Sequence, residues 1–242
     1  MRALIISDIH ANLVALEAVL ARAGSVDAVW CLGDVIGYGP KPNECVEIVR
    51  ELPNLICLQG NHDAAATGDL SLDSFNPEAR KSLEWQGQAL TEEAREFLVD
   101  RPRNEELGGF TLVHASPRQP ILEYLLDSYS ALENFDFFES DYCLVGHTHI
   151  PVLFSMANGT KTVSQFIPEP GSTIQLQQRC IINPGSVGQP RDRDSRAAFA
   201  ILDTEKAQWD YQRVEYDIGS VQQQMRDAGL PARHIERLML GW

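Results

Sequence analysis

The stretch Leu4-Ile5-Ile6-Ser7-Asp8-Ile9-His10 opens the chain with an apolar run that ends in metal-binding side chains. A short run of branched apolar residues is typical of a buried strand. Asp8 and His10 are two residues apart, and on extended backbone such residues project to the same side. We therefore expect both side chains to face one site just beyond the end of the strand.

Four further apolar runs lead into side chains of the same kinds. Val29-Trp30-Cys31-Leu32 leads to Gly33-Asp34, Leu55-Ile56-Cys57-Leu58 to Gly60-Asn61-His62-Asp63, Thr111-Leu112-Val113 to His114, and Cys143-Leu144-Val145 to Gly146-His147-Thr148-His149. Ligands of open α/β sheets bind outside the carboxyl ends of the strands. If these strands share one direction, their polar groups converge on one rim.

The side chains at this rim indicate a transition-metal site. Imidazole, carboxylate and amide oxygen together suit Mn, Fe, Zn, Co or Ni better than Ca or Mg. The chain has 6 histidines, and all except His234 belong to this set. So many histidines at strand ends favour metal ligands over isolated structural histidines. His234 falls in a predicted C-terminal helix and is interpreted as a surface residue.

The ordered motifs Asp-x-His, Gly-Asp, Gly-Asn-His-Asp, a lone His and Gly-His-x-His resemble the calcineurin-like metallophosphoesterase superfamily over residues 8–149. The resemblance implies an α/β fold of four layers, α-β-β-α, in which two mixed sheets are flanked by helices. That superfamily includes protein phosphatases, cyclic-nucleotide phosphodiesterases, dinucleoside polyphosphate hydrolases and DNA-repair nucleases. The fold alone therefore leaves the substrate open.

The resemblance also implies a role for each motif residue. The first metal ion would be held by Asp8, His10, Asp34 and His149, and the second by Asp34, Asn61, His114 and His147. Asp34 and a hydroxide would bridge the two divalent ions, for which Mn is favoured. The hydroxide would attack phosphorus, and His62 would face the substrate and protonate the leaving oxygen as general acid.

Two positions depart from the pattern Gly-Asp-x-x-Asp-Arg that many members carry. Gly37 stands where the second Asp orients the catalytic histidine, and Tyr38 stands where the Arg binds phosphate. Asp63, the carboxylate next to His62, is predicted to belong to the catalytic group. Tyr38 either contacts the organic arm of a phosphodiester or packs at the base of its loop.

A turn-rich segment, residues 183–191, resembles the small phosphodiesterase-like branch of bacteria and archaea. Its sequence is Asn183-Pro184-Gly185-Ser186-Val187-Gly188-Gln189-Pro190-Arg191. Its backbone N–H groups are expected to form part of the wall of the site. Arg191 either supplies the phosphate contact that is absent at position 38 or is solvated beside a structural turn.

Composition narrows the choice of partners. The net charge of −14 is opposite in sign to that of most polyanion binders, so we expect no stable nucleic-acid binding. The apolar runs are too short for a membrane span or a signal peptide, which favours the cytoplasm. The 5 cysteines lack paired spacing and are interpreted as buried free thiols. We expect one domain over residues 1–242, as a monomer or homodimer.

Periodicity places these motifs in an alternating pattern of strands and helices. Helices are predicted over 12–22, 42–50, 77–90, 91–99, 217–228 and 232–240, and strands over 3–7, 28–32, 55–58, 110–113, 142–145, 152–156, 180–182, 197–202 and 208–214. Thr91 is expected to cap a helix and Asn158-Gly159 to form a hairpin turn. The last two helices are expected to pack on the core, with a dimer contact as the alternative, through Val221, Met225, Ile235, Leu238 and Met239.

The sequence thus predicts a metal-dependent phosphoesterase that acts on a small phosphate ester, with a phosphodiester favoured. The alternatives among enzymes are a dinucleoside polyphosphate hydrolase and a protein Ser/Thr phosphatase. The alternative from another class is a catalytically silent metal-binding scaffold. The presence of every expected ligand together with His62 favours an enzyme over the scaffold.

Overall fold

Two six-stranded mixed sheets form the centre of the computed structural model, which describes residues 1–157, 159–177 and 179–242. The first sheet has the order β3-β2-β1-β11-β12-β9 and the second the order β4-β5-β6-β10-β7-β8. The first contains β1 Arg2–Ile6, β2 Ala28–Cys31, β3 Ile56–Cys57, β9 Thr173–Gln175, β11 Ala197–Asp203 and β12 Gln208–Val214. The second contains β4 Asn104–Leu107, β5 Phe110–Val113, β6 Tyr142–Leu144, β7 Val152–Met156, β8 Val163–Phe166 and β10 Arg179–Asn183.

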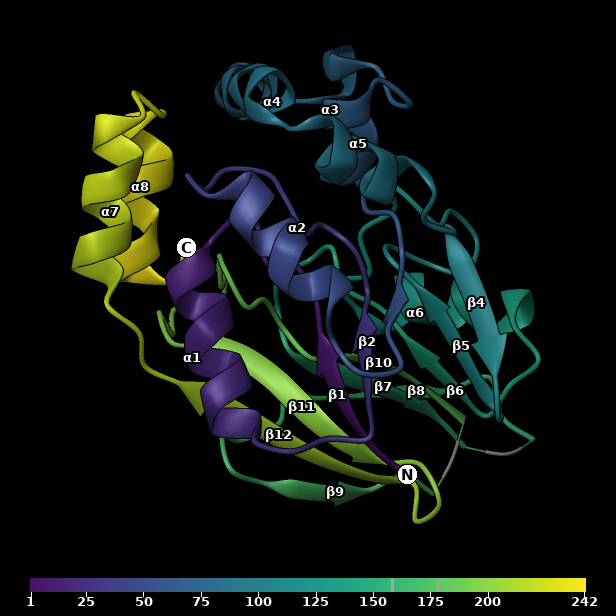
Figure 1. Cartoon of the computed structure of the whole chain (residues 1–242). Helices are drawn as coiled ribbons and strands as arrows, with labels where there is room; N and C mark the ends of the chain where they lie inside the picture. The colour runs from purple at the N-terminus through teal and green to yellow at the C-terminus, as the bar shows by residue number, and fades with distance from the viewer. Residues whose placement is uncertain (158, 178) are drawn as a thin grey trace.

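Helices cover the outer faces of both sheets (Figure 1). Their bounds are α1 Leu13–Ala23, α2 Pro42–Arg50, α3 Asn61–Thr67, α4 Pro77–Ala89, α5 Glu92–Val99, α6 Ser128–Asn134, α7 Ile218–Asp227 and α8 Ala232–Leu240, with 3₁₀ turns η1 Leu72–Ser74 and η2 Phe135–Phe137. Helices α1, α2 and α5 pack on the first sheet, whereas α6 and η2 pack on the second. The expected four-layer α-β-β-α fold is confirmed.

The alternation of side chains along β1 builds two cores at once. Leu4 and Ile6 face the helices α1 and α2, whereas Ala3 and Ile5 face the second sheet. Between the sheets, Ala3 and Ile5 join an apolar cluster with residues of both sheets, among them Trp30, Leu144 and Ile182. This shared cluster fixes the position of one sheet on the other. The loops at the ends of the strands therefore keep fixed positions.

The last two helices form a hairpin, drawn in yellow in Figure 1. Its apolar cluster consists of Val221, Met225, Leu230, Ile235 and Leu238 and contacts Val14 of α1 and Trp85 of α4. The predicted packing on the core is therefore confirmed except at one residue. Met239 is 55% exposed because it lies one residue, about 100° around the helix, beyond the buried Leu238.

Some elements differ from the sequence prediction. Strand β3 has only two residues, and α3, α6, β4, β8 and β9 were not predicted. Strand β4, Asn104–Leu107, is polar because it pairs only with β5 at the edge of its sheet. The predicted cap is confirmed, since the Thr91 side chain accepts a hydrogen bond from the Ala94 N–H. Asn158 of the predicted turn lies outside the described residues.

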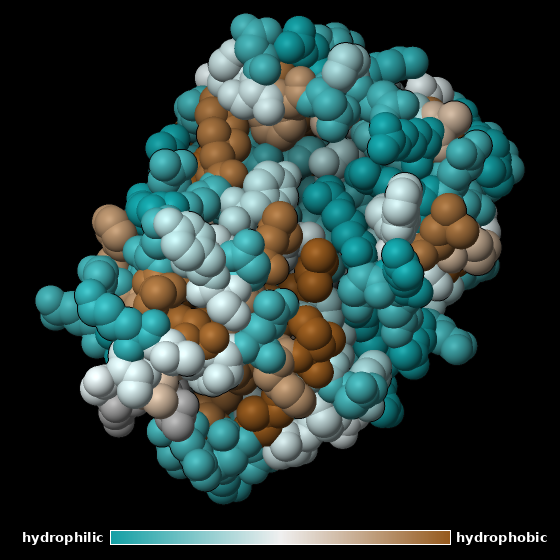
Figure 2. Space-filling view, turned by 180° about the vertical axis from the view of Figure 1, so that it is seen from behind, coloured by the Kyte–Doolittle hydropathy of each residue, from teal (hydrophilic) through white to brown (hydrophobic). Residues whose placement is uncertain are grey.

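The cysteines agree with the interpretation of buried free thiols. All five cysteines are buried and free. On the face opposite to that of Figure 1, several apolar groups gather over the middle and lower part, with hydrophilic and intermediate side chains around them (Figure 2). Within the described part of the chain, every helix is too short or too polar to cross a membrane.

Candidate metal centre

The motif residues gather at one end of the two sheets because the strands before them run parallel. Strand β2 pairs in parallel with β1 and β3, and β6 pairs in parallel with β5 and β10. Hydrogen bonds join the loops that follow. The His10 N–H donates to the Asp34 carbonyl at 3.0 Å, and the His147 N–H donates to the Asp8 carboxylate at 3.1 Å. The second of these bonds links loops from different sheets.

The backbone of these loops is left-handed rather than extended. The φ angles are +54° at Asp8, +50° at His10, +54° at Asp34, +63° at His147 and +61° at His149. The expected extended geometry for the two Asp/His-x-His pairs was therefore wrong, although each pair does face one site. Non-glycine residues in this region store strain, and such strain concentrates at functional sites.

One cluster joins Asp8, His10 and His149. Nε2 of His149 lies 3.3 Å from Oδ1 of Asp8 and 3.0 Å from Nε2 of His10. Nε2 of His10 lies 3.8 Å from Oδ1 of Asp8 and 3.7 Å from Oδ2 of Asp34. Ligand atoms at ~2.0–2.2 Å from one ion are themselves roughly 3–3.5 Å apart, so these separations fit a metal ion.

A second cluster joins Asp34, His114 and His147. Nε2 of His114 lies 3.5 Å from Oδ2 of Asp34 and 3.0 Å from the amide oxygen of Asn61. Oδ2 of Asp34 therefore lies within 4 Å of a histidine of each cluster. The structure brings together all seven residues predicted from the sequence as ligands. Asp34 belongs to the second cluster and also forms a group with His10 of the first cluster and with His62.

The buried polar atoms at this centre fit the predicted ions. Among the described residues, Oδ1 of Asp8, Oδ2 of Asp34 and Nε2 of His147 are buried without a hydrogen-bond partner. Three imidazoles donate Nδ1–H to backbone carbonyls, which leaves their Nε2 lone pairs facing the centre: His10 to Ile36, His114 to Leu32 and His149 to Gln189. Such bonds fix the tautomer and orientation that metal-binding histidines need.

Electrostatics at the centre also favour cation binding. Burial holds the pKa values of His10 and His149 well below the usual range and lowers that of His147 to about 3, so these rings are neutral. Burial opposes charge on Asp34 and His114 as well, but their mutual attraction prevails. It keeps the pKa of Asp34 well below its usual range and raises that of His114 to about 9. Metal binding uses neutral imidazole and ionised carboxylate, so an ion at the second cluster would take the place of the His114 proton.

His62 lies in the first turn of α3 beside this centre. Its backbone N–H donates to Oδ1 of Asp34 at 2.8 Å, and its ring packs against Tyr38 and Phe75. A Cβ at Gly37 would lie 2.6 Å from Nδ1 of His62, so that position points at the ring nitrogen. Because glycine has no side chain, Nδ1 is buried without a partner in the described chain. Ring packing therefore orients His62.

Asp63 faces the backbone of the metal-binding loops. Its carboxylate accepts hydrogen bonds from the N–H groups of Val35, Ile36 and Gly60. Gly60 precedes α3, so one carboxylate ties the start of this helix to the loop that contains Asp34. These hydrogen bonds let Asp63 stabilise the backbone of the two loops. Its predicted catalytic role stays a prediction.

Residues 183–191 brace the metal-binding loops instead of presenting free N–H groups. The N–H groups of Val187 and Gly188 donate to the carbonyls of Ser7 and Asp8, both at 3.0 Å. The Asn12 side chain donates to the Gly188 carbonyl. The expectation that these N–H groups line the site was wrong, because the neighbouring loop uses them. Their effect is to fix the backbone of Asp8.

Gly188→Ala is expected to lower the free energy of unfolding by about 1–3 kcal/mol or more, because overpacking of a filled site has this cost. A Cβ there would lie 1.8 Å from the carbonyl oxygen of Ile9. Ile9 stands in the sequence between Asp8 and His10, two of the predicted ligands. Gly219→Ala in α7 is the matched control, with its nearest atom at 3.4 Å, and should raise stability by about 0.5 kcal/mol. Urea unfolding measures both. Equal stability of the two variants would contradict the bracing role.

Three residues surround the ring of Tyr38, which is only 7% exposed. His10 and His62 pack against it at centroid distances of 4.6 and 4.4 Å. His234 packs on it at 4.7 Å and bonds to Ser82, so the interpretation of His234 as a surface residue was wrong. Its burial follows from docking of α8, which no local pattern reveals. The structure therefore packs the Tyr38 ring among these histidines beside the site, and its predicted contact with substrate stays a prediction.

Two further residues near the site, Tyr124 and Arg237, had no sequence signal. Tyr124 stacks on His147 at a centroid distance of 4.1 Å. Arg237 of α8 lies over the Tyr38 ring, and Gln189 accepts hydrogen bonds from Arg191 and Arg237. Each of the two comes from a segment distant in sequence from the motifs, so only the tertiary fold identifies it.

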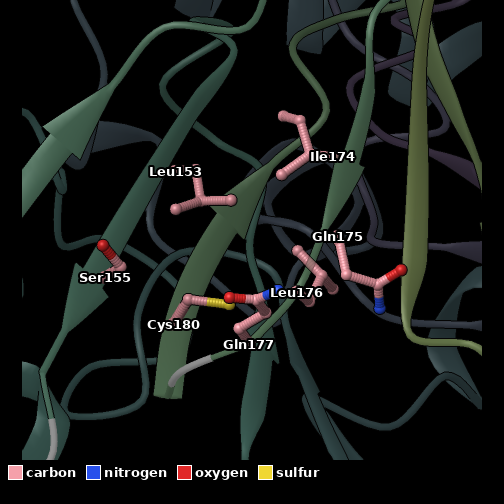
Figure 3. A pocket seen from close by; sticks show the side chains of 7 residues that line it. All are labelled: Leu153, Ser155, Ile174, Gln175, Leu176, Gln177 and Cys180. Carbon is pink, nitrogen blue, oxygen red and sulfur yellow. The ribbon is translucent and has the colours of Figure 1, made fainter.

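A cavity of about 150 Å³ lies away from this centre (Figure 3). Its described lining comes from β7, β9 and β10 and contains Leu153, Ser155, Ile174, Gln175, Leu176, Gln177 and Cys180. Cys180 lies near the start of β10, whereas the loop that contacts the metal ligands follows its end. Among these residues there is no histidine or carboxylate, so the cavity lacks the chemistry of the metal centre.

Comparison with known proteins agrees with the geometry. The calcineurin-like phosphoesterase superfamily domain matches residues 1–207. An uncharacterized protein of Methanocaldococcus jannaschii is 37% identical over 98% of this chain and 97% of its own length.

Solved structures extend this comparison to three dimensions. The crystal structure of a metallophosphoesterase from Sphaerobacter thermophilus is 48% identical, with a TM-score of 0.92 over 100% of this chain and 99% of that one. A hypothetical protein from Pyrococcus horikoshii shares the fold, at 21% identity and a TM-score of 0.80 over 100% of this chain and 98% of that one. This chain therefore belongs to the calcineurin-like phosphoesterase superfamily and is a hydrolase of phosphate esters.

Proposed function

We propose that the protein is a phosphodiesterase that uses two divalent metal ions, with Mn favoured. The observation that carries this proposal is the position of Asp34. Its unpartnered Oδ2 lies 3.7 Å from Nε2 of His10 and 3.5 Å from Nε2 of His114, one in each ligand cluster. A carboxylate shared in this way is suited to bridge two cations. The imidazole-rich donor set favours Mn, Fe, Zn, Co or Ni.

The first ion would be held by Asp8, His10, Asp34 and His149, and the second by Asp34, Asn61, His114 and His147. Ions bound there supply an activated water and polarise the phosphoryl oxygens. The protein's own residues hold the ester and move protons. His62 is the proton donor for the leaving oxygen, because its ring groups with His10 and Asp34 and its Nδ1 has no hydrogen-bond partner among the described residues.

Arg191 is the residue proposed to hold the phosphoryl group in place of an arginine at position 38. Its Nη2 donates to the Tyr38 hydroxyl at 3.3 Å, and the Tyr38 ring contacts His10 and His62. The guanidinium thus lies one side chain away from the ligands. We also propose that residues 1–242 act as one domain, which the apolar cluster shared by both sheets supports.

The preference for a diester rests on Tyr38. A terminal phosphomonoester is dianionic, whereas a diester has one charge less and a second organic arm. A tyrosine in place of an arginine suits such an arm, because its ring is apolar and its tip polar. Bis(p-nitrophenyl) phosphate should therefore give a higher kcat/KM than p-nitrophenyl phosphate in the presence of Mn.

Tyr38→Ala is expected to lower kcat/KM for the diester about fivefold more than for the monoester, since an aromatic contact contributes about 1 kcal/mol. Tyr38→Phe, which keeps the ring and removes the hydroxyl next to Arg191, is the control and should retain most of the diester preference. The kcat/KM values of wild type and both variants on the two esters decide the question. If p-nitrophenyl phosphate or a phosphoserine peptide is the better wild-type substrate, the diester preference is wrong while the metal centre stands.

A further inference from the structure

Two arginines from distant segments meet above Tyr38. Arg191 follows the bracing segment after β10, and Arg237 lies in α8, beyond the residues that match the superfamily domain. The guanidinium carbon of Arg237 lies 4.5 Å from the centroid of the Tyr38 ring, and that of Arg191 lies 5.8 Å from it. Helix α8 is anchored on the same ring by His234, three residues before Arg237.

A single neutral side chain holds the two guanidiniums together. Oε1 of Gln189 accepts hydrogen bonds from Nη2 of Arg191, at 3.2 Å, and from Nη2 of Arg237. Nη2 of Arg191 also donates to the Tyr38 hydroxyl. In the described part of the chain, Nε of both arginines is buried without a partner. Each guanidinium therefore keeps hydrogen-bonding capacity that the protein does not use.

Arg191 and Arg237 differ from other arginines of the molecule in their charged neighbours. The buried Arg213 is paired with Asp192, and Arg196 is paired with Asp194. Across residues 1–157, 159–177 and 179–242, neither Arg191 nor Arg237 forms an ion pair with a carboxylate. Burial and the neighbouring Arg191 lower the pKa of Arg237 to about 10. Two like charges held together without a counter-ion are unfavourable until an anion joins them.

Arg237 also has a route to the surface. Arg237 lines a surface cavity of about 240 Å³ together with Arg233, Glu236, Leu240 and Trp242. Tyr38 lies on the other side of Arg237 and contacts the proposed metal ligand His10 and the proposed proton donor His62. A ligand that reaches from the metal centre toward this cavity would pass the two guanidiniums.

We propose that Arg237, held beside the phosphoryl-binding Arg191, extends the site into an anion subsite that binds a second phosphate group of the substrate. This proposal rests on the proposed phosphodiesterase function and narrows its substrate to organic phosphate esters that carry a further phosphate. Guanidinium groups bind phosphate oxygens through paired hydrogen bonds, and the two free Nε–H groups are donors of this kind. The C-terminal hairpin thus supplies part of the specificity of the site.

The first test measures anion binding without catalysis. The full chain is treated with EDTA and titrated calorimetrically with pyrophosphate at low ionic strength. Arg237→Gln should weaken binding about 10–100-fold, because a hydrogen bond to a charged group contributes roughly 1.5–3 kcal/mol. Arg237→Lys, which keeps the charge, should recover part of the loss. Arg226→Gln removes an exposed arginine of α7 in the same hairpin and should change the affinity less than about twofold.

Equal affinity of wild type and Arg237→Gln, or no binding by wild type, would overturn the subsite. Because this test needs no metal ion and no turnover, its outcome is independent of the proposed reaction. A folding defect is excluded by requiring Arg237→Lys and Arg237→Gln to melt with the same cooperativity as wild type. A lower melting temperature with an unchanged pyrophosphate affinity would mean that Arg237 only attaches the hairpin.

The second test links the subsite to substrate choice. The Mn-loaded wild type and Arg237→Gln are compared on a dinucleoside tetraphosphate and on bis(p-nitrophenyl) phosphate, which has no second phosphate. The variant should shift the ratio of the two kcat/KM values against the tetraphosphate by about tenfold. An unchanged ratio would mean that the guanidinium acts on the scissile phosphate alone, and the assignment of a second phosphate would be wrong.

Discussion

Asp34→Asn is expected to abolish turnover and to reduce the metal content of Mn-loaded protein from about two ions per chain to one or fewer. The carboxylate lies between a histidine of each cluster, His10 and His114, and its Oδ2 is buried and unpartnered in the described structure. Replacement by an amide removes the negative charge that offsets two cations. The loss of kcat should be on the order of 10³ or more, comparable to removal of a main electrostatic group.

Elemental analysis and anomalous scattering measure the number of ions, and the ions should be ~3.5–4 Å apart. Asp73→Asn, at an exposed carboxylate that pairs only with Arg80, is the control and should bind metal as wild type does. Thermal unfolding gives an independent readout, since Mn should raise the melting temperature of wild type more than that of Asp34→Asn. Full metal content and activity in the variant would exclude the shared-carboxylate assignment.

His62→Ala should lower kcat on the order of 10²–10⁴-fold for an alkyl ester, whose leaving alkoxide needs a proton. The loss should be much smaller for p-nitrophenyl esters, because p-nitrophenolate leaves without protonation. The ring lies beside the centre, and its backbone N–H is held by Asp34 at 2.8 Å. Removal of the ring therefore leaves both ligand clusters in place.

His234→Ala is the matched control for this prediction. His234 is also a buried histidine in contact with Tyr38, but it lies outside both ligand clusters. Its removal should reduce activity equally for the two leaving groups, as a packing defect does. Rates are compared at saturating substrate with equal metal content. Equal losses for both leaving groups in His62→Ala would assign His62 to positioning or metal support.

The candidate metal ligands could be located from the sequence because each follows a strand in a short ordered motif. The run before Asp8 is recognisable as a strand, and its parallel neighbours bring the next motifs to the same end of the sheet. The conformation of these loops was not predictable. Hydrogen bonds between loops impose the left-handed backbone at Asp8 and Asp34. The local conformational propensity of the residues does not reveal such bonds.

Residues that act through tertiary contacts were missed for the same reason. In the sequence, His234 and Arg237 occupy polar positions of an amphipathic helix. Only the docking of α8 brings both side chains against Tyr38. Helix α3 was missed because its first turn consists of the metal motif Asn61-His62-Asp63, which has no apolar period. The bracing role of Asp63 likewise depends on the loop at Val35, far away in the chain.

The order in which the strands pair has a consequence for how the chain is made. Strand β1 lies at the middle of its sheet, yet its partner β11 comes from residues 197–203. At synthesis rates of roughly 5–20 residues per second, β1 waits about 10–40 s with one edge unpaired. Such an edge can pair with other chains, so the nascent protein depends on chaperones or on rapid burial of that edge. The candidate metal centre and the two arginines beside it come together only after the ribosome has passed residue 237.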